Sequence, residues 1–398
     1  MKTRQLKSRP LPFVLILVLM AHATCAQITL VNVGNTNNGG LAHGIAVAGN
    51  YAYIANDTDG LRIYDVSNPA HPVNVGHTNN GGTAYNVAVS GHFAYVAAYT
   101  NGLLVYYILT PANPVNVGHT NFSGFVFSLA VQGDYAYLGG DSSFGIFNII
   151  NPGTPTLVVQ TNGGIFPGAN PAGVAVSGNY VVLADGGGSP GGVTAFSLSN
   201  GTNLTNLGRT NNGGSANGVA LAGQYAYVAN GTDGFRIYDL SLSGGPVSVG
   251  HVTNAPISGA SGNGVTLSGN FAFLADAAGG LRVFDITSAA NPIIAGQVFG
   301  FPLFPYDVAV SGNYAYVANG QDGLSIYAIE PQLNIGLADP NTLLISWPAI
   351  GSFGLQQNMD LATSNWMTLT NKPVTSGSQN QILLPLSGDS VFYRLKSP

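Results

Sequence analysis

The chain has 398 residues, of which 45% are hydrophobic and only 7% are charged, whereas roughly 25% of the residues of an average soluble domain carry a charge. This composition excludes disorder caused by high net charge, and it excludes coiled coils, whose solvated faces need Glu, Lys and Arg. The 55 glycines and 22 prolines are typical of short strands joined by tight turns, so we expect an all-β protein.

Residues 1–26 have the pattern of a secretory signal peptide. A basic start, an apolar stretch over residues 11–20 and small residues before Gln27 follow one another, and the apolar stretch is too short to span a bilayer. No later stretch reaches about 18 uninterrupted apolar residues. We therefore expect no transmembrane segment and a protein that is secreted, periplasmic or on the cell surface. A lipid anchor on Cys25, the only cysteine, is the alternative.

The chain after residue 26 is acidic and lacks cysteine. Seven basic residues remain against sixteen acidic ones, a net charge of −9. Nucleic acid is not an expected partner, because no basic stripe is present to neutralise its phosphates. Packing and hydrogen bonding alone must stabilise the exported protein, since no disulfide can form within it.

A unit that opens at Gly49 as GNYAYIANDTDGLRIYDVSNPAHPVNVGHTNNGG recurs along the chain to residue 330. Its first glycine has counterparts every 42 to 46 residues, at Gly91, Gly133, Gly178, Gly223, Gly269 and Gly312. A period of this length with several strands per unit predicts the blades of a β-propeller. Copies three and four are degraded, so six or eight blades are the alternatives to seven.

Four short strands fit each unit. In the fifth copy they cover residues 217–223, 225–230, 235–240 and 245–252, and Asp233-Gly234 supplies the hairpin turn between the second and the third. The last copy ends after its third strand, and the segment ITLVNVG at residues 28–34 matches the missing fourth. We therefore expect residues 27–331 to form a seven-bladed β-propeller of four-stranded blades, with the N-terminal strand closing the last blade.

Residues 332–398 follow a different pattern, with half a dozen short apolar runs separated by polar turns. This pattern predicts a small C-terminal β-sandwich appended to the propeller. Trp347 and Trp366, the only tryptophans, both fall in this region and are expected in its core.

The segments GLRIYDVSNPAHPVNVG at residues 60–76 and GLRVFDITSAANPIIAG at residues 280–296 carry a family resemblance. Over residues 28–330 the chain resembles the LVIVD-repeat family of secreted bacterial β-propellers, although Phe147-Asn148 and Phe196-Ser197 replace the usual aromatic-Asp pair. The C-terminal region looks like a module at the ends of large secreted proteins of the Verrucomicrobia and Planctomycetes. The resemblance implies a fold and an extracytoplasmic location, and it carries no catalytic residues.

Three histidines, His77, His119 and His251, share one position of the repeat. Equivalent residues of different blades are spread around a ring on the order of 40 Å across, so they cannot bind one metal ion. We expect each of them to hydrogen-bond a turn.

The repeated aspartates Asp65, Asp239 and Asp285 end the third strand of their units. We expect their side chains to accept hydrogen bonds from backbone N–H groups of the following turn. The DTDG segment at residues 57–60 is predicted to form a hairpin turn. A calcium loop is the alternative for DTDG, although the glutamate that ends such a loop is missing.

Functional residues of propellers usually lie where the loops of different blades converge on the central channel. The two residues before each first strand vary while their neighbours repeat, and we expect these pairs to ring one mouth of the channel. The candidate ligand-binding residues among them are His43, Tyr85, Asn86, Phe127, Asn217, Asn263, Tyr306 and Asp307, and the other members are Gly44, Ser128, Ala172, Gly173, Gly218 and Gly264. Aromatic faces and amides suit a glycan or a peptide. The alternative is that these residues only cap strands and line a water-filled channel.

The chain after residue 26 contains neither an HExxH nor a GxxxxGK[ST] pattern and no cysteine nucleophile. A glycosidase would need two carboxylates within about 10 Å of one another, and no spacing favours such a pair. We therefore expect no catalytic residue, metal or cofactor, and interpret the protein as a non-enzymatic extracytoplasmic scaffold that binds a protein or a glycan. A secreted lyase or hydrolase using the same mouth and a structural cell-surface domain are the alternatives.

Overall fold

The computed structural model describes residues 27–37, 39–79, 82–141, 143–162, 171–186, 191–211, 213–253, 262–299, 304–387 and 390–397. Within these ranges the one helical element is a single 3-10 turn, η1 (Ala277–Gly279), and no helix there is long and apolar enough to cross a membrane. The all-β expectation is confirmed. The expected signal peptide, with Cys25, lies outside the described residues.

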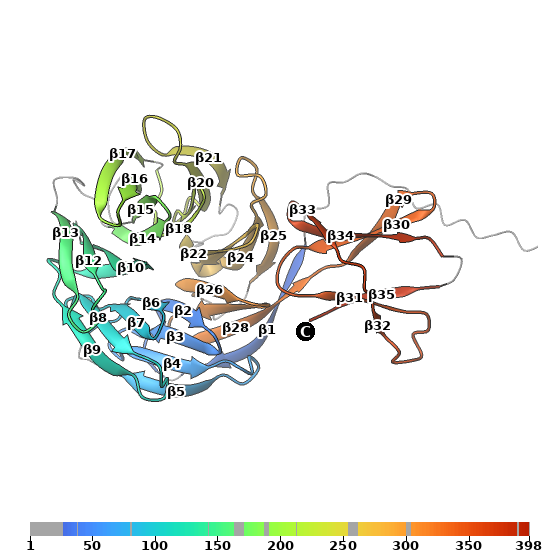
Figure 1. The fold of residues 1–398 in the computed structure, drawn as a ribbon, viewed down its shortest axis with the longest axis horizontal. Helices are drawn as coiled ribbons and strands as arrows, with labels where there is room; N and C mark the ends of the chain where they lie inside the picture. The colour runs from blue at the N-terminus through green and yellow to red at the C-terminus, as the bar shows by residue number, and fades with distance from the viewer. Residues whose placement is uncertain are drawn as a thin grey trace, which may run out of the picture.

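Seven four-stranded antiparallel sheets follow one another as blades around a ring (Figure 1). Blade 1 contains β2 (Gly44–Ala48), β3 (Tyr51–Ala55), β4 (Leu61–Asp65) and β5 (Val73–Thr78), and blade 2 contains β6 (Asn86–Ser90), β7 (Phe93–Ala97), β8 (Leu103–Tyr107) and β9 (Val115–Thr120). Blade 3 contains β10 (Val126–Gln132), β11 (Tyr135–Gly140), β12 (Ser143–Asn148) and β13 (Thr156–Asn162), and blade 4 contains β14 (Pro171–Ser177), β15 (Tyr180–Asp185), β16 (Gly192–Ser199) and β17 (Asn203–Asn211).

The remaining blades repeat the arrangement. Blade 5 contains β18 (Gly218–Ala222), β19 (Tyr225–Ala229), β20 (Phe235–Asp239) and β21 (Val247–Val252), and blade 6 contains β22 (Gly262–Ser268), β23 (Phe271–Asp276), β24 (Gly280–Asp285) and β25 (Ile293–Val298). Blade 7 contains β26 (Asp307–Ser311), β27 (Tyr314–Ala318), β28 (Leu324–Pro331) and β1 (Ile28–Thr36). The four strands expected in the fifth copy lie within two residues of those observed in blade 5.

The N-terminal strand closes the ring, as expected. β1 pairs antiparallel with β28, from Ile28 opposite Pro331 to Thr36 opposite Leu324. The first strands contact one another in the order β2, β6, β10, β14, β18, β22 and β26, and β26 contacts β2 again. β1 therefore covers the edge of β28 that would otherwise be open to pairing with another chain.

Hydrophobic cores lie between neighbouring blades. One core combines Tyr53 of blade 1 with Val96 of blade 2, and a similar cluster lies at each of the other six blade boundaries. Side chains point alternately to the two faces of a strand, and both faces of a blade are covered, so the middle strands are almost continuously apolar. The degraded copies also take part, because Phe144 of blade 3 packs with Phe196 of blade 4.

The seven marker glycines of the repeat each open the two-residue loop between the first and second strands. Their φ angles all lie between 55° and 58°. A positive φ at the first loop residue is the arrangement of a type II′ hairpin, for which glycine is preferred.

The PVxVG part of the repeat brings the outer strand of one blade against the loop between the third and fourth strands of the next blade. β4 and β5 shift register between Ile63 and Tyr64, and the same β-bulge recurs in the other six blades. Beside the bulge, a Cβ atom on Gly76 would lie 2.0 Å from the carbonyl oxygen of Pro111 in the next blade. Only glycine leaves room for this close approach of two backbones.

Beyond Pro331 the chain forms two further sheets. One contains β29 (Asn334–Asp339), β30 (Thr342–Pro348), β34 (Gln379–Pro385) and β33 (Val374–Ser376), and the other contains β32 (Met367–Thr368), β31 (Gly354–Asn358) and β35 (Phe392–Lys396). Trp347 of β30 and Leu355 of β31 share one core, so both sheets contribute to it. The expectation for Trp366 is wrong. Its ring is partly exposed beneath the Arg394 guanidinium, 4.2 Å away, because it precedes a two-residue strand at a sheet edge.

The C-terminal sheets contact the hairpins that follow the first strands of blades 6 and 7. Asn270 donates a hydrogen bond of 2.7 Å from Nδ2 to the carbonyl oxygen of Gly377. Asn313 donates to the Ser352 carbonyl at 3.1 Å and accepts from the Ser352 N–H at 2.7 Å. These hairpins lie at the end of the first strands that is opposite to their starts.

Leu30→Ala tests the closure of the ring by β1. Leu30 is 7% exposed and packs in the core between blades 6 and 7, whereas Val31, on the other face of the strand, is 37% exposed. We expect Leu30→Ala to lower the free energy of unfolding by about 2–4 kcal/mol, and Val31→Ala to change it by less than about 0.5 kcal/mol. Urea unfolding followed by circular dichroism measures both, and equal effects would contradict the pairing described here.

Candidate functional site

The repeated histidines each bond a turn of their own blade, which confirms the expectation. His77 Nε2 lies 2.8 Å from the carbonyl oxygen of Asp59. The Nε2 atoms of His119 and His251 lie 2.9 Å from the carbonyl oxygens of Asn101 and Asp233. These carbonyls belong to the turn between the second and third strands, so the histidines connect the fourth strand to that turn.

The repeated aspartates also have the expected structural role. The Oδ1 atoms of Asp65, Asp239 and Asp285 each accept a hydrogen bond from the backbone N–H two residues later, at 2.8 to 3.0 Å. They therefore stabilise the start of the loop between the third and fourth strands.

The DTDG turn of blade 1 binds an arginine, a partner that the sequence analysis missed. Asp59 forms an ion pair with Arg62 and accepts a hydrogen bond of 2.7 Å from Asn56 Nδ2. Burial acts to raise the pKa of Asp59, but the hydrogen bonds from Arg62 and Asn56 outweigh it and hold the pKa below its usual value. Blade 5 repeats the pair with Asp233 and Arg236. Among the described residues, no three His, Cys, Asp or Glu side chains are grouped as metal ligands.

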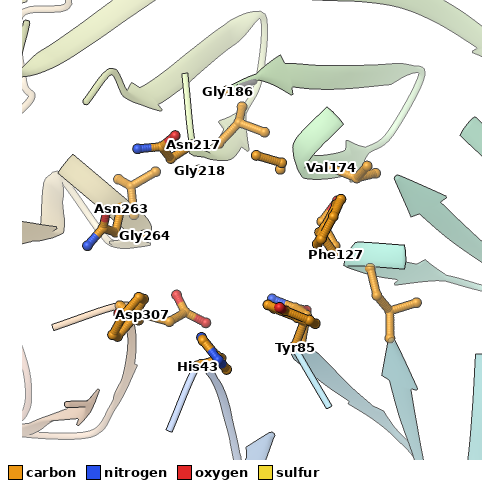
Figure 2. A pocket seen from close by; sticks show the side chains of 18 residues that line it. His43, Tyr85, Phe127, Val174, Gly186, Asn217, Gly218, Asn263, Gly264 and Asp307 are labelled. Carbon is orange, nitrogen blue, oxygen red and sulfur yellow. The ribbon is translucent and has the colours of Figure 1, made fainter. Parts of the chain in front are cut away.

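The starts of the first strands surround one cavity of about 410 Å³, which we call the mouth cavity (Figure 2). Its lining contains every candidate ligand-binding residue, namely His43, Tyr85, Asn86, Phe127, Asn217, Asn263, Tyr306 and Asp307. Ser128, Ala172, Gly173, Gly218 and Gly264 line it as well, whereas Gly44 does not. Residues from all seven blades therefore meet at one end of the ring.

One wall of the mouth cavity is aromatic. The ring of His43 lies between those of Tyr85 and Tyr306, with centroids 4.7 and 5.0 Å away, and Tyr85 meets Phe127 edge to face at 5.3 Å. These side chains come from blades 7, 1, 2 and 3, so the wall crosses three blade boundaries. Such tilted and edge-to-face contacts are worth about 0.5–1.5 kcal/mol each and fix the orientation of the rings.

The opposite wall is formed by small residues and amides. Figure 2 shows Asn217 and Asn263 across the cavity from Tyr85 and Phe127. Asn263 donates a hydrogen bond of 2.9 Å from Nδ2 to the carbonyl oxygen of Pro305, which orients its amide. A Cβ atom on Gly218 would lie 2.5 Å from the Asn263 carbonyl oxygen, so the first strands of blades 5 and 6 are in close contact here.

His43 and Asp307 have shifted pKa values. Burial raises the pKa of Asp307 to about 6, although two backbone hydrogen bonds act to lower it. These bonds come from the N–H of Ile45, 3.1 Å from Oδ2, and of Val308, 2.9 Å from Oδ1. Burial lowers the pKa of His43, and the charge of Asp57 opposes that shift. At neutral pH the cavity thus holds a neutral imidazole and a carboxylate that joins blade 7 to blade 1.

The sequence analysis missed two aromatic residues beside the mouth cavity. Tyr99 lies 5.5 Å from Tyr85 between ring centroids, and it stacks on Phe125 at 4.2 Å. The signal for Tyr99 was present, because the same repeat position is Gly231 in blade 5 and Gly320 in blade 7. A comparison of the copies at this position would have singled out the tyrosine.

A family model for the LVIVD repeat matches residues 39–80, 81–121, 123–162, 170–189, 213–253, 259–299 and 306–329. The chain belongs to the LVIVD repeat family. Each LVIVD repeat corresponds to one blade. The match in blade 4 is short, as the degraded copy predicts, and the last ends at residue 329, where β1 supplies the fourth strand. No curated protein matches this chain.

Several solved structures share the β-propeller fold at low sequence identity. The computationally designed protein Ika8 matches with a TM-score of 0.54 and 10% identity, over 76% of this chain and 99% of its own. A chain of the mitotic checkpoint complex matches with a TM-score of 0.58 and 11% identity, over 81% and 100%. BamB from Moraxella catarrhalis matches with a TM-score of 0.50 and 14% identity, over 74% and 83%. Because the sequence identities are this low, these similarities support the fold of the LVIVD repeats and nothing about their function.

Asp307→Asn tests the partly buried carboxylate of the mouth cavity. Its pKa of about 6 lies above the ordinary value of 3.8, so the folded protein binds more protons than the unfolded one between these values, and the contribution of Asp307 to stability falls as pH rises through that window. We expect the variant to gain stability relative to the wild type from pH 4 to pH 7 in urea unfolding. Asp134→Asn, at an exposed site, controls for the lost charge. A stability difference that does not vary with pH would contradict the raised pKa.

Proposed function

We propose that this protein is a non-enzymatic, exported binding scaffold whose propeller mouth recognises a glycan or a segment of protein. The proposal is carried by the mouth cavity, in which an aromatic wall faces amide-bearing residues. Aromatic faces hold apolar surface, and amides supply donors and acceptors that orient a neutral polar ligand. Hydrogen-bonded sheets hold these groups in place, so binding requires little ordering of the site.

A lyase or hydrolase working in the same cavity is the alternative function. Shifted pKa values such as those of His43 and Asp307 also occur in active sites. However, Asp307 is the one acidic side chain among the described lining residues, whereas a glycosidase needs two. Both oxygens of Asp307 already accept backbone hydrogen bonds, and His43 is packed between two tyrosine rings. These contacts favour binding over catalysis.

The proposal includes a location and a role for the two ends of the chain. We infer that residues 1–26 direct export from a bacterial cell and are removed before Gln27, and that residues 332–398 form a β-sandwich module for attachment or spacing. The basic, apolar and small residues of the first segment support export. The module contacts the end of the ring opposite the mouth, so attachment through it would direct the mouth outward. Intact-mass measurement of the secreted protein tests the cleavage.

Tyr85→Ala and Tyr306→Ala test the mouth as a binding site. Both rings form the aromatic wall and neither belongs to an interblade core. We expect each variant to bind its ligand at least about tenfold more weakly, a loss of about 1.4 kcal/mol, and to remain folded, with an unfolding temperature lowered only by the lost ring contacts. Glycan and peptide arrays probed with the chain from Gln27 identify the ligand, and titration calorimetry measures the affinity.

Tyr107→Ala is the matched control. Tyr107 is a partly exposed tyrosine of blade 2, the blade that also holds Tyr85, but it lies at the end of β8 away from the mouth. Wild-type affinity in this variant together with loss in the mouth variants supports the proposal. Release of reducing ends from an arrayed polysaccharide would replace it with an enzyme. Full binding by both mouth variants would move the site to another surface and favour a structural cell-surface role.

A further inference from the structure

Tyr99 has a backbone conformation that disfavours a bulky residue. It lies in the hairpin between β7 and β8 with φ 44°, in the left-handed region. The equivalent residues of blades 5 and 7 are Gly231 and Gly320, with φ 58° and 55°, for which this conformation carries no steric penalty. A tyrosine here costs about 1–2 kcal/mol relative to glycine. The structure shared by the blades therefore does not explain why this position holds an aromatic residue.

The ring of Tyr99 extends the aromatic wall of the mouth cavity outward. On one side it approaches Tyr85 and Phe127, with centroids 5.5 and 5.7 Å away. On the other it stacks on Phe125 with an interplanar angle of 8° and a centroid distance of 4.2 Å. Phe125 is 38% exposed. The cavity wall is thus continuous, ring by ring, with a phenyl group at the surface of blade 3.

The backbone holds this pair in position. The N–H of Val126 donates to the carbonyl oxygen of Tyr99 at 3.1 Å, and the N–H of Asp141 donates to that of Phe125 at 2.8 Å. The hairpin of blade 2 is therefore bonded to the segment that leads into the first strand of blade 3. Rings fixed in this way lose little freedom when a ligand binds.

We propose that the mouth cavity and the Tyr99–Phe125 pair form one extended site for a linear, neutral oligosaccharide, with its first two units in the cavity and the following units on the Tyr99 and Phe125 rings. This inference rests on the proposed function and assigns the ligand class. A pyranose unit presents C–H groups that suit an aromatic face and hydroxyl groups that suit the amides of Asn217 and Asn263. No Lys or Arg occurs among the described lining residues, so the site has no cation for an acidic sugar chain.

The dependence of affinity on chain length tests this inference. Cello-, xylo- and malto-oligosaccharides from disaccharide to hexasaccharide are titrated calorimetrically into the wild type, Tyr99→Gly and Phe125→Ala. For the series that binds, we expect wild-type affinity to rise with length. Both variants should bind the hexasaccharide about tenfold more weakly, equivalent to about 1.4 kcal/mol, and the disaccharide with wild-type affinity. Tyr99→Gly should remain folded, because relief of the unfavourable backbone conformation offsets part of the stability lost with its ring contacts.

Two controls separate the possible explanations. Asn200→Gly removes another left-handed non-glycine residue, with φ 51° in the turn after β16, and should leave the length dependence unchanged. Tyr85→Ala should weaken the disaccharide and the hexasaccharide alike. The extended site would be wrong if the wild type bound all chain lengths with equal affinity, or if Tyr99→Gly kept the wild-type dependence on length. Either result would still allow the mouth cavity to be the binding site. If the protein bound peptides but no oligosaccharide, the assigned ligand class would be wrong. If Tyr85→Ala bound every ligand with wild-type affinity, the proposed function itself would be wrong.

Discussion

The pairing of β1 with β28 is the interaction on which the rest of the propeller depends. It brings Ile28 opposite Pro331 and so joins the two ends of the repeat array. Only a closed ring brings the first strand of blade 7 against that of blade 1, and only then can the Asp307 carboxylate accept a hydrogen bond from the Ile45 N–H across the seam. The same closure places His43 beside Tyr306. The seam of the ring is therefore also part of the mouth cavity.

The residues that recur in the copies are those that every blade boundary needs. The bulge in the fourth strand and the glycine next to it allow the outer strands to approach the loop of the following blade, as Gly76 does with Pro111. The repeated aspartates and histidines bond turns within their own blades. Because these positions serve packing, the proposed ligand recognition falls to positions where the copies differ. Those positions converge at the starts of the first strands.

The sequence predicted the blades and the lining of the mouth for one physical reason. A fixed period places equivalent residues at equivalent points of the ring, so residues before the first strands must meet around the axis. Contacts that arise between different repeat positions could not be predicted in this way. Tyr99 belongs to a hairpin of blade 2 and Phe125 to the approach to blade 3, and they stack only when the two blades pack together. Trp366 likewise depends on the pairing of β32, which has two residues.

Several differences between copies on the aromatic side of the mouth are unfavourable for folding. Tyr99, with φ 44°, stands where blades 5 and 7 have glycine and blade 1 has Asp57 at φ 54°. Asp307 replaces the glycine found at Gly218 and Gly264, and burial raises its pKa because the charged form is destabilised there. His43 has a lowered pKa for the same reason. Glycine at the positions of Tyr99 and Asp307 would avoid these two costs. Local departures of this kind, supported by a rigid fold, are typical of binding sites. They support the proposal that the ligand binds on the aromatic side of the mouth, over blades 7, 1, 2 and 3.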